Sequence, residues 1–384
     1  MNHHREFGYS AEQRMIAESL PPLLQSTLPW SKIRELDELA EFPHDAYAAL
    51  AKAGWMGLPY PADCGGTGGS YKDLTVFVET VAYHNAQMAS AWLTTVIYGG
   101  MQVCQNALSA LRQRIMSCVI NGSVKLALCI TEPDTGSDVS AIRTTAAADG
   151  DEFVITGQKV YITCAHVADH LVVATKTDPE AGHRGITLFL VDAHSPGVSI
   201  RPLKGMGRRM IHTNEVFFDG VRVSGAQVLG GLNQGWKALM RGLNLERLCL
   251  AASAVGNMRR IIDYARDYAT QRRQFDRPIV EFQVIAHKFA EMQIMYETAL
   301  AILHRAADML DAGLAPTLET SAAKVYCTTE SNVRCADMGM QIMGGAAWMM
   351  EHEMQMYYRD CRVGPIGGGT AEIMKNVIAK QMNL

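Results

Sequence analysis

One stretch decides the fold of this chain: Leu128-Cys129-Ile130-Thr131-Glu132-Pro133-Asp134-Thr135-Gly136-Ser137-Asp138. Its short apolar run ends at Thr-Glu-Pro and is followed by a turn rich in small polar residues. Thr131 and Ser137 offer hydroxyl groups, Gly136 permits a positive φ, and the loop can expose several backbone N–H groups. The loop is therefore a candidate wall for a polar ligand with carbonyl and phosphate groups; an ordinary strand-to-turn connection is the alternative.

The residues on either side of this stretch change in character twice. Residues 11 to about 124 carry apolar positions at helical spacing, with Ser10 as a candidate N-cap and Pro21-Pro22 as the end of the first helix. Short β-branched and aromatic runs follow up to about residue 230, and long stretches with few helix breakers begin at Gly235. The strand runs are 126–130, 153–155, 171–174, 186–191 and 215–218, and the last helical stretches are 236–270, 284–310, 318–343 and 371–382.

This order predicts an α+β protein that is mainly α. No helical pattern separates the strands, which is typical of a small antiparallel barrel or sandwich. We predict an N-terminal helical domain over 1–124, a middle β-domain over 125–232 and a C-terminal helical domain over 233–384. A chain of 384 residues has room for two or three such domains.

Composition argues against several classes of protein. A formal net charge of −4 with 19% charged residues offers no basic surface for nucleic acid. No apolar run reaches the roughly 18 residues of a membrane helix. Residues 1–20 have neither the apolar centre of a secretory signal nor the acid-poor pattern of a transit sequence. The nine cysteines show no Cys-x-x-Cys and no zinc-site spacing, so we expect no metal and a cytoplasmic location.

Three further segments agree with residues 128–138 in order and spacing. They are Tyr161-Ile162-Thr163, residues 272–283, and Gln341-Ile342-Met343-Gly344-Gly345 with the glycine-rich turn near the C-terminus. Together these motifs resemble those of acyl-CoA dehydrogenases, a flavoprotein family, over nearly the whole chain. The resemblance implies the same domain order, with the C-terminal helices forming a four-helix bundle. It also implies FAD as cofactor, an acyl thioester as substrate, a homotetramer, and an electron-transfer flavoprotein as partner.

The resemblance further implies a set of cofactor contacts. Residues of the 128–138 loop and of 161–163 flank the isoalloxazine ring, with Tyr161 where tryptophan is common. The 272–283 segment reaches the flavin of a neighbouring subunit, and it carries Asp276 in place of the usual glycine. No Gly-x-Gly-x-x-Gly follows a strand, which argues against a Rossmann site. The implied cofactor-binding residues are Leu128, Ile130, Thr131, Gly136, Ser137, Tyr161, Ile162, Thr163, Arg272, Phe275, Gln283, Gln341, Gly344, Gly345, Thr370 and Glu372.

The catalytic base is the point at which this chain departs from the largest branch of the family. That branch carries a glutamate in a C-terminal Tyr-Glu-Gly-Thr, and the corresponding residue here is Gly368. A second branch, resembling isovaleryl-CoA and crotonobetainyl-CoA enzymes, places the glutamate on a helix before an arginine. Asn244-Leu245-Glu246-Arg247-Leu248 fits that pattern, so the resemblance implies Glu246 as the base. Removing a weakly acidic α-proton requires a carboxylate in a dry pocket that raises its pKa.

Two alternatives for Glu246 remain open. Its carboxylate can pair with Arg247 or another cation on a helix surface. The chain can also be a member of the family that binds flavin without dehydrogenating a substrate.

The substrate side is described by fewer motifs. The 205–213 loop is basic and lies where the family meets the carrier arm, so its charges meet CoA phosphates or an acidic carrier protein, or are solvated turn charges. Its basic residues are Arg208, Arg209 and His212. The backbone N–H of Gly368 is a candidate donor to the thioester carbonyl. The implied substrate-binding residues are Ser137, Asn244, Arg247, Gly368 and Gly369.

The leading hypothesis is an FAD-dependent acyl-CoA dehydrogenase that forms an α,β-double bond. Alternatives with related chemistry are a carrier-protein-bound acyl or aminoacyl substrate, the reverse reduction of an enoyl thioester, and an oxidase. A non-dehydrogenase flavoprotein and a helical scaffold without cofactor are the alternatives from other classes. A visible absorption spectrum separates that scaffold from the flavoproteins.

Overall fold

A computed structural model describes residues 8–384, which form two compact units. One unit consists of Glu35–Gly69 and Ser90–Leu243 and contains the large sheet. The other consists of the described residues up to Arg34, of Ser70–Ala89 and of Asn244–Leu384, and it is mainly helical. Residues 1–7, which begin the segment assessed above for a leader, lie outside the described residues.

Eight strands form one sheet in the unit that includes residues 90–243. They are β1 Leu126–Cys129, β2 Thr145–Asp149, β3 Glu152–Thr163, β4 His170–Lys176, β5 Ile186–Asp192, β6 Val198–Leu203, β7 Thr213–Ser224 and β8 Val228–Leu229. Their order is β6-β7-β3-β2-β4-β5-β8, with β1 beside β4. Most pairs are antiparallel, as predicted, but β1 and β2 each pair parallel with β4. A parallel pair needs a long connection, and the β2–β3 hairpin and its flanking loops, which lie between β1 and β4 in the chain, provide it.

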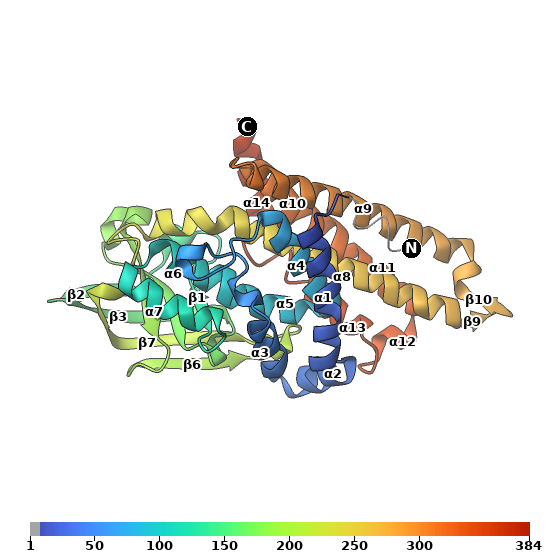
Figure 1. Cartoon of the computed structure of the whole chain (residues 1–384), viewed down its shortest axis with the longest axis horizontal. Helices are drawn as coiled ribbons and strands as arrows, with labels where there is room; N and C mark the ends of the chain where they lie inside the picture. The colour runs from blue at the N-terminus through green and yellow to red at the C-terminus, as the bar shows by residue number, and fades with distance from the viewer. Residues whose placement is uncertain (1–7) are drawn as a thin grey trace. The chain divides into compact units, whose positions relative to one another are not determined.

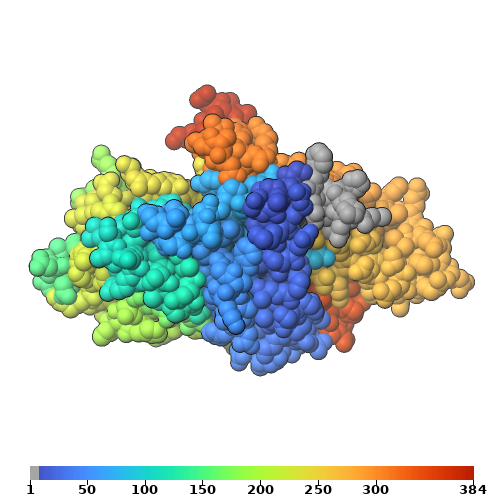
Figure 2. All heavy atoms as spheres, viewed as in Figure 1, coloured from blue at the N-terminus to red at the C-terminus, as the bar shows by residue number. Residues whose placement is uncertain are grey.

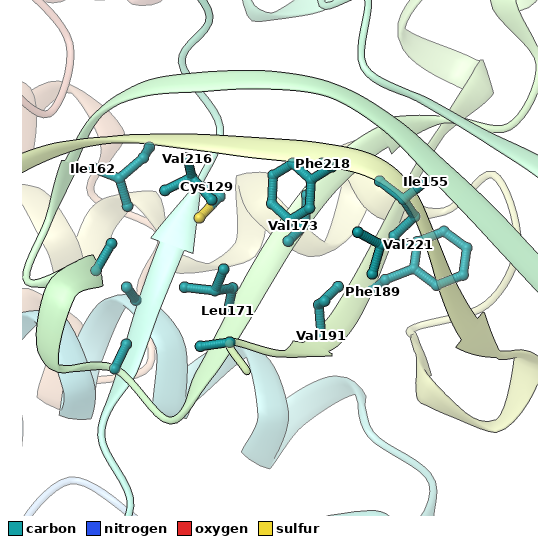
Figure 3. Packing of buried hydrophobic residues seen from close by; sticks show 14 of the residues in the cluster. Cys129, Ile155, Ile162, Leu171, Val173, Phe189, Val191, Val216, Phe218 and Val221 are labelled. Carbon is teal, nitrogen blue, oxygen red and sulfur yellow. The ribbon is translucent and has the colours of Figure 1, made fainter. Parts of the chain in front are cut away.

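The core of this unit lies between two parts of the sheet. Figure 3 shows side chains from β3 and β7 facing those from β1, β4 and β5. Successive side chains of a strand point to opposite faces, so alternate residues of each strand lie in this core, whereas β4 and β5 are buried on both faces. The members labelled in Figure 3 are Cys129, Ile155, Ile162, Leu171, Val173, Phe189, Val191, Val216, Phe218 and Val221.

Three strands of this sheet were missed by the sequence prediction. β2 is mostly alanine, β6 contains an arginine and a proline, and β8 has two residues, so none carries a strong strand pattern. β1 packs against a π-helix, Thr94–Gly100, where the backbone of Gly99 lies so close to Leu126 that an added Cβ would be 2.5 Å from the Leu126 Cβ. The other helices of this unit are α3 His44–Lys52, α6 Met101–Asn106 and α7 Ser109–Ile120.

The second unit is built mainly from helices that were predicted from their apolar spacing (Figure 1). The stretch predicted for 318–343 is continuous, with a π-helix, Tyr326–Asn332, between α10 and α11. The short helices α12 and α13 were not predicted. The helices that lie wholly in this second unit are α1 Ala11–Thr27, α4 Tyr71–His84, α9 Gln283–Asp311, α10 Thr317–Val325, α11 Val333–Met343, α12 Gly345–Trp348, α13 Met354–Cys361 and α14 Ala371–Gln381. Three helices contribute residues to both units: α2 Trp30–Leu39, α5 Ala86–Leu93 and α8 Gly235–Gln271.

The first helix corrects one prediction. Ser10 caps α1 as expected, in a capping box with Gln13, but the helix does not end at Pro21-Pro22 and continues to Thr27. Each proline removes one backbone donor. The buried side chains of Leu20 and Leu24 continue the apolar face through the prolines, and this face packs on α4. Tertiary packing therefore outweighs the local cost, while the outer side of α1 lies at the molecular surface (Figure 2).

The N-terminus of α4 is capped twice. Ser70 and Asp73 form a capping box, and the Asp311 carboxylate at the end of α9 accepts hydrogen bonds from Tyr71 N at 2.7 Å and Lys72 N at 3.0 Å. These contacts satisfy backbone donors that a helix start leaves free. None of the described helices combines the length and the apolar character needed to cross a bilayer.

Candidate active site

A buried ion pair anchors the loop that follows β1. Lys159 Nζ lies 2.8 Å from Glu132 Oε1 and donates a second hydrogen bond to Ile130 O at 2.9 Å. The Glu132 carboxylate also accepts from Arg143 N at 2.6 Å and Thr144 N at 2.9 Å. Burial raises the pKa of Glu132, but Lys159 and these hydrogen bonds outweigh it and lower that pKa below 4.5. The ion pair thus fixes both ends of the loop.

In the unit that contains the sheet, a hydrogen bond connects the two segments predicted to bind flavin, the 128–138 loop and residues 161–163, through the neighbouring residue 160. Val160 N donates to Thr131 O at 2.9 Å, which places the Thr131 loop beside the end of β3. Tyr161 is 66% exposed with φ near 60°, so its ring is available to a ligand, whereas Ile162 is buried. The other implied residues of the two segments are half-buried (Leu128, Ile130, Thr131, Thr163) or exposed (Gly136, Ser137).

The reason given for Gly136 is wrong. Gly136 does not have a positive φ, and nothing lies within 4 Å of the place where its Cβ would be. The turn instead forms through Glu132 and Thr135, whose backbone N–H and C=O groups exchange hydrogen bonds of 3.0 and 3.1 Å.

The helical unit contains a cavity of about 600 Å³ beside the predicted 272–283 segment. Arg272, Phe275 and Gly345 line it, and Ile342 and Met343, which follow Gln341, lie on its wall. The structure therefore brings together two motifs that are far apart in sequence. An arginine, aromatic rings and exposed glycine backbone suit a ligand that combines a flat ring with phosphate groups, so these residues fit the adenosine diphosphate part of FAD. Glu246, Gly368 and Thr370 do not line this cavity.

The 272–283 segment is a short hairpin. Its strands are β9 Arg273–Gln274 and β10 Arg277–Pro278, and the two turn residues Phe275 and Asp276 have φ of 50° and 63°. Such a turn favours glycine or asparagine, so the family's usual glycine at position 276 would relieve strain there. Phe275 is 87% exposed, and Gln283 is the exposed first residue of α9.

Glycines also shape the backbone at two other predicted contacts. Gly344 ends α11 with φ near 60°, and the Cβ positions of Gly344 and Gly345 are open. Gly368 and Gly369 have φ of 64° and 83° and lead into α14, where Thr370 caps the helix by accepting from Ile373 N at 3.2 Å. Backbone and Thr370 hydrogen bonds at this helix start lower the pKa of Glu372. A helix start of this kind suits a phosphate or hydroxyl-rich ligand.

Glu246 lies on α8, half-buried, with its carboxylate facing the glycine turn. A Cβ added at Gly368 would be 3.3 Å from Glu246 Oε1 and 2.3 Å from Leu250 Cδ1. Within residues 8–384, no hydrogen bond or ion pair joins the Glu246 carboxylate to another side chain. Burial raises the pKa of Glu246, and Arg247 and Lys324 oppose that rise. These are the properties required of a base in a dry site.

Arg247 does not form the surface ion pair considered above. Its side chain is buried, and Nη1 donates to Asn244 Oδ1 at 3.2 Å. Asn244 also contacts Thr317 Oγ1 at 3.3 Å and accepts from Thr320 Oγ1 at 3.1 Å. The Arg247 Nε has no partner among the described residues. The two implied substrate residues of α8 therefore belong to one polar network.

Two basic side chains of the loop after β6 bind other parts of the protein, which the sequence did not indicate. Arg209 donates to Glu38 O at 3.0 Å and lies 3.9 Å from Asp37, and His212 contacts Ala40 O at 2.7 Å. These contacts favour a role for both residues in anchoring the loop.

The sequence interpretation missed three buried charged residues: Lys159 and Glu132 in the unit that contains the sheet, and Lys324 in the mainly helical unit. Lys324 is a fully buried lysine on α10, and the signal for it is a charged residue in the otherwise small and apolar run Ala322-Ala323-Lys324-Val325. Lys159 and Glu132 carry no such local signal, because their partnership forms between β3 and a loop 27 residues earlier.

Replacing Gly368 with alanine is expected to slow any reaction at Glu246 by at least about tenfold and to cost about 1–2 kcal/mol in the free energy of unfolding. The new Cβ requires Leu250 to move and strains a residue at φ 64°. Gly367→Ala is the matched control, because its Cβ would meet nothing closer than 3.6 Å. Equal behaviour of the two variants in chemical denaturation and flavin reduction would contradict the geometry described here.

Glu246→Gln is expected to stabilise the protein in a pH-dependent way. The pKa of Glu246 is raised above 4.5, so ionising it costs the folded state free energy that the unfolded state does not lose. The variant should have the same melting temperature as wild type below pH 4.5 and a higher one above the folded pKa of Glu246. Thermal unfolding followed between pH 4 and 8 measures this, and a difference that does not change with pH would contradict it.

Three family models match the chain in order. They describe the acyl-CoA dehydrogenase N-terminal domain over residues 10–123, the middle domain over 127–221 and the C-terminal domain over 233–383. The matches cover most of the chain and both of its units.

Curated relatives and solved structures agree with these matches. The chain is 33% identical to a 3-(aryl)acrylate reductase of Clostridium sporogenes, over 91% of this chain and 92% of that protein. It is 32% identical to subunit CarC of the caffeyl-CoA reductase–Etf complex of Acetobacterium woodii, over 97% and 98%. Its structure resembles butyryl-CoA dehydrogenase from Megasphaera elsdenii with a TM-score of 0.93 at 26% identity, over 98% and 99% of the two chains.

Proposed function

The chain belongs to the acyl-CoA dehydrogenase family of flavin-dependent oxidoreductases, and we propose that it forms the α,β-double bond of an acyl-CoA thioester with Glu246 as base. The observation that carries this proposal is the unpartnered, half-buried Glu246 carboxylate against the Gly368 turn. A carboxylate with a raised pKa can take an α-proton that water would leave in place.

The residues of the chain have separate roles in this reaction. Glu246 removes the α-proton and holds it on a carboxyl oxygen. The Gly368 N–H donates to the thioester carbonyl as enolate charge develops, and Ser137, Asn244, Arg247 and Gly369 orient the substrate. Bound FAD supplies the acceptor for the β-hydride.

We propose FAD as the cofactor. The residues that would hold it are those named above in the 128–138 loop, at 161–163, along the 600 Å³ cavity and at the start of α14. Arg272 suits the pyrophosphate, and Tyr161 offers a flat face to the isoalloxazine ring. The location of this protein in the cytoplasm and its assembly as a homotetramer are part of the same proposal.

The reverse reaction is a second candidate. Two relatives are named as reductases of aryl-substituted acrylates or their CoA esters. Reduction of an enoyl thioester would use the same residues, with Glu246 returning a proton to the α-carbon. One of these relatives is named as part of a complex with Etf, which supports an electron-transfer flavoprotein as the redox partner here.

Anaerobic titration of the purified yellow protein tests the proposal. A panel of saturated aliphatic and arylpropionyl CoA esters is added to oxidised protein, and the matching enoyl esters are added to chemically reduced protein. Bleaching by a saturated ester supports dehydrogenation, and preferential reoxidation by an enoyl ester supports the reductase. Protein that holds flavin but responds to no CoA ester would exclude both CoA proposals and favour a carrier-bound substrate or a non-dehydrogenase flavoprotein.

A further inference from the structure

A buried lysine lies beside the proposed base and has no role in the proposal so far. Lys324 on α10 has no exposed side-chain surface, and its ammonium donates to Gly364 O at 3.0 Å and Gly369 O at 2.6 Å. Among the described residues it forms no ion pair with a carboxylate within 4.0 Å. A buried ammonium without a carboxylate partner is costly, so its presence here calls for a specific reason.

The two carbonyls that Lys324 binds belong to the ends of the glycine turn. Between them lies Gly368, whose backbone faces Glu246 Oε1. Three consecutive glycines have no side chains with which to hold a conformation, and Gly368 and Gly369 both adopt a positive φ. Besides Lys324, the turn is held by backbone hydrogen bonds from Gly367 N to Val363 O at 2.8 Å and from Ala371 N to Pro365 O at 2.9 Å. Lys324 is the side chain that ties the first end of the turn to the last.

The charge of Lys324 also acts on Glu246. The charged groups around the ammonium are Glu246 and Arg247 from α8 and Glu372 from α14. Burial lowers the pKa of Lys324 to about 8, with Glu246 and Glu372 opposing and Arg247 reinforcing that shift. Below that pH the ammonium is charged, and it favours the ionised form of Glu246 against the effect of burial.

We propose that Lys324 is a positioning residue for the base: it clamps the glycine turn against Glu246 and keeps that carboxylate ionised in a dry site. The base role of Glu246 rests on the proposed function, whereas the clamp and the charge effect do not. Arg247 contributes a second positive charge, so Lys324 tunes the protonation of Glu246 and does not control it alone.

The test is an infrared pH titration of the flavin-bound protein between pH 4.5 and 8. The carboxyl band of Glu246 is identified as the band that Glu246→Gln removes. In Lys324→Met and Lys324→Gln its midpoint should move up by about 1 pH unit, because each variant removes the ammonium charge. Glutamine keeps a donor for the two carbonyls, so Lys324→Gln also serves if Lys324→Met does not fold. Lys324→Arg, which keeps the charge, should retain the wild-type midpoint.

Lys375→Met is the matched control, because Lys375 is an exposed lysine on α14 whose nearest carboxylate, Glu330, is 4.0 Å away. It should leave the Glu246 midpoint unchanged. An unchanged midpoint in folded, flavin-bound Lys324→Gln would overturn the proposal, as would a shift of the same size in Lys324→Arg. The titration needs no substrate, so a chain that reduces no thioester would defeat the proposed function without deciding the role of Lys324.

Discussion

Flavin reduction by an acyl thioester should fall by about 10³-fold when Glu246 is replaced by glutamine. The glutamine amide has the shape of the carboxylate but cannot take a proton. The decrease in the reduction rate therefore measures the contribution of proton abstraction. FAD should remain bound, because none of the residues that line the cavity beside Arg272 is altered. Rapid-mixing absorbance under anaerobic conditions measures the reduction rate, and the flavin spectrum reports binding.

Two variants sharpen this result. Glu246→Asp keeps a carboxylate on a side chain that is shorter by one methylene, so it should retain a measurable part of the reduction rate. Asp267→Asn removes an exposed carboxylate from the same helix and should leave the rate unchanged. In wild type the rate should rise with pH through the pKa of Glu246, which lies above 4.5, and this limb should be absent in Glu246→Gln. An unchanged rate in Glu246→Gln would mean that another group is the base.

Lys159→Met is expected to destabilise the strand-containing unit by about 3–5 kcal/mol, the cost of leaving a buried charge without its partner. Lys159 has no exposed side-chain surface, and its partner Glu132 is only 6% exposed. Flavin should also bind more weakly, because the ion pair holds the loop that carries Thr131 and Ser137. Urea denaturation followed by circular dichroism gives the change in free energy, and flavin fluorescence gives the change in affinity.

Arg222→Met is the matched control for this variant. Arg222 on β7 lies 2.6 Å from Asp149 and 2.8 Å from Glu152, distances comparable to that of the buried pair. The side chains of Arg222, Asp149 and Glu152 are 56%, 59% and 46% exposed, so removing Arg222 should change stability little. Similar losses in Arg222→Met and Lys159→Met would show that burial does not set the strength of the Lys159–Glu132 pair.

Sequence periodicity predicted the long elements well for a physical reason. A helix such as α9 buries one face along its length, so apolar residues recur at helical spacing and can be recognised from its own sequence. The ends and irregularities depend on partners far away in sequence. α1 passes through Pro21-Pro22 because Leu24 has α4 to pack on, and β2 exists because β3 pairs with it. Neither partner is visible in a local window.

In the candidate site too, local motifs could be recognised from the sequence, whereas contacts between distant residues could not. Motif resemblance indicated Glu246, and the structure places its carboxylate against Gly368, the position at which another branch carries the acid. The residues that tune this arrangement, Lys324 above all, act through contacts between α10 and a turn some 40 residues later, which no motif encodes. The domain boundaries at 124 and 232 and the roles of the individual site residues stay predictions.

The capping of α4 by Asp311 has a consequence for how the chain folds as it is made. The carboxylate that satisfies Tyr71 N is synthesised 240 residues after it. At about 5–20 residues per second, α4 waits roughly 10–50 s on the ribosome for that partner. The segments that form the sheet, from Leu126 to Leu229, emerge completely during this interval. α4 therefore remains without α9 while the strands are made, so the surface that α9 later covers is open to chaperones during this time.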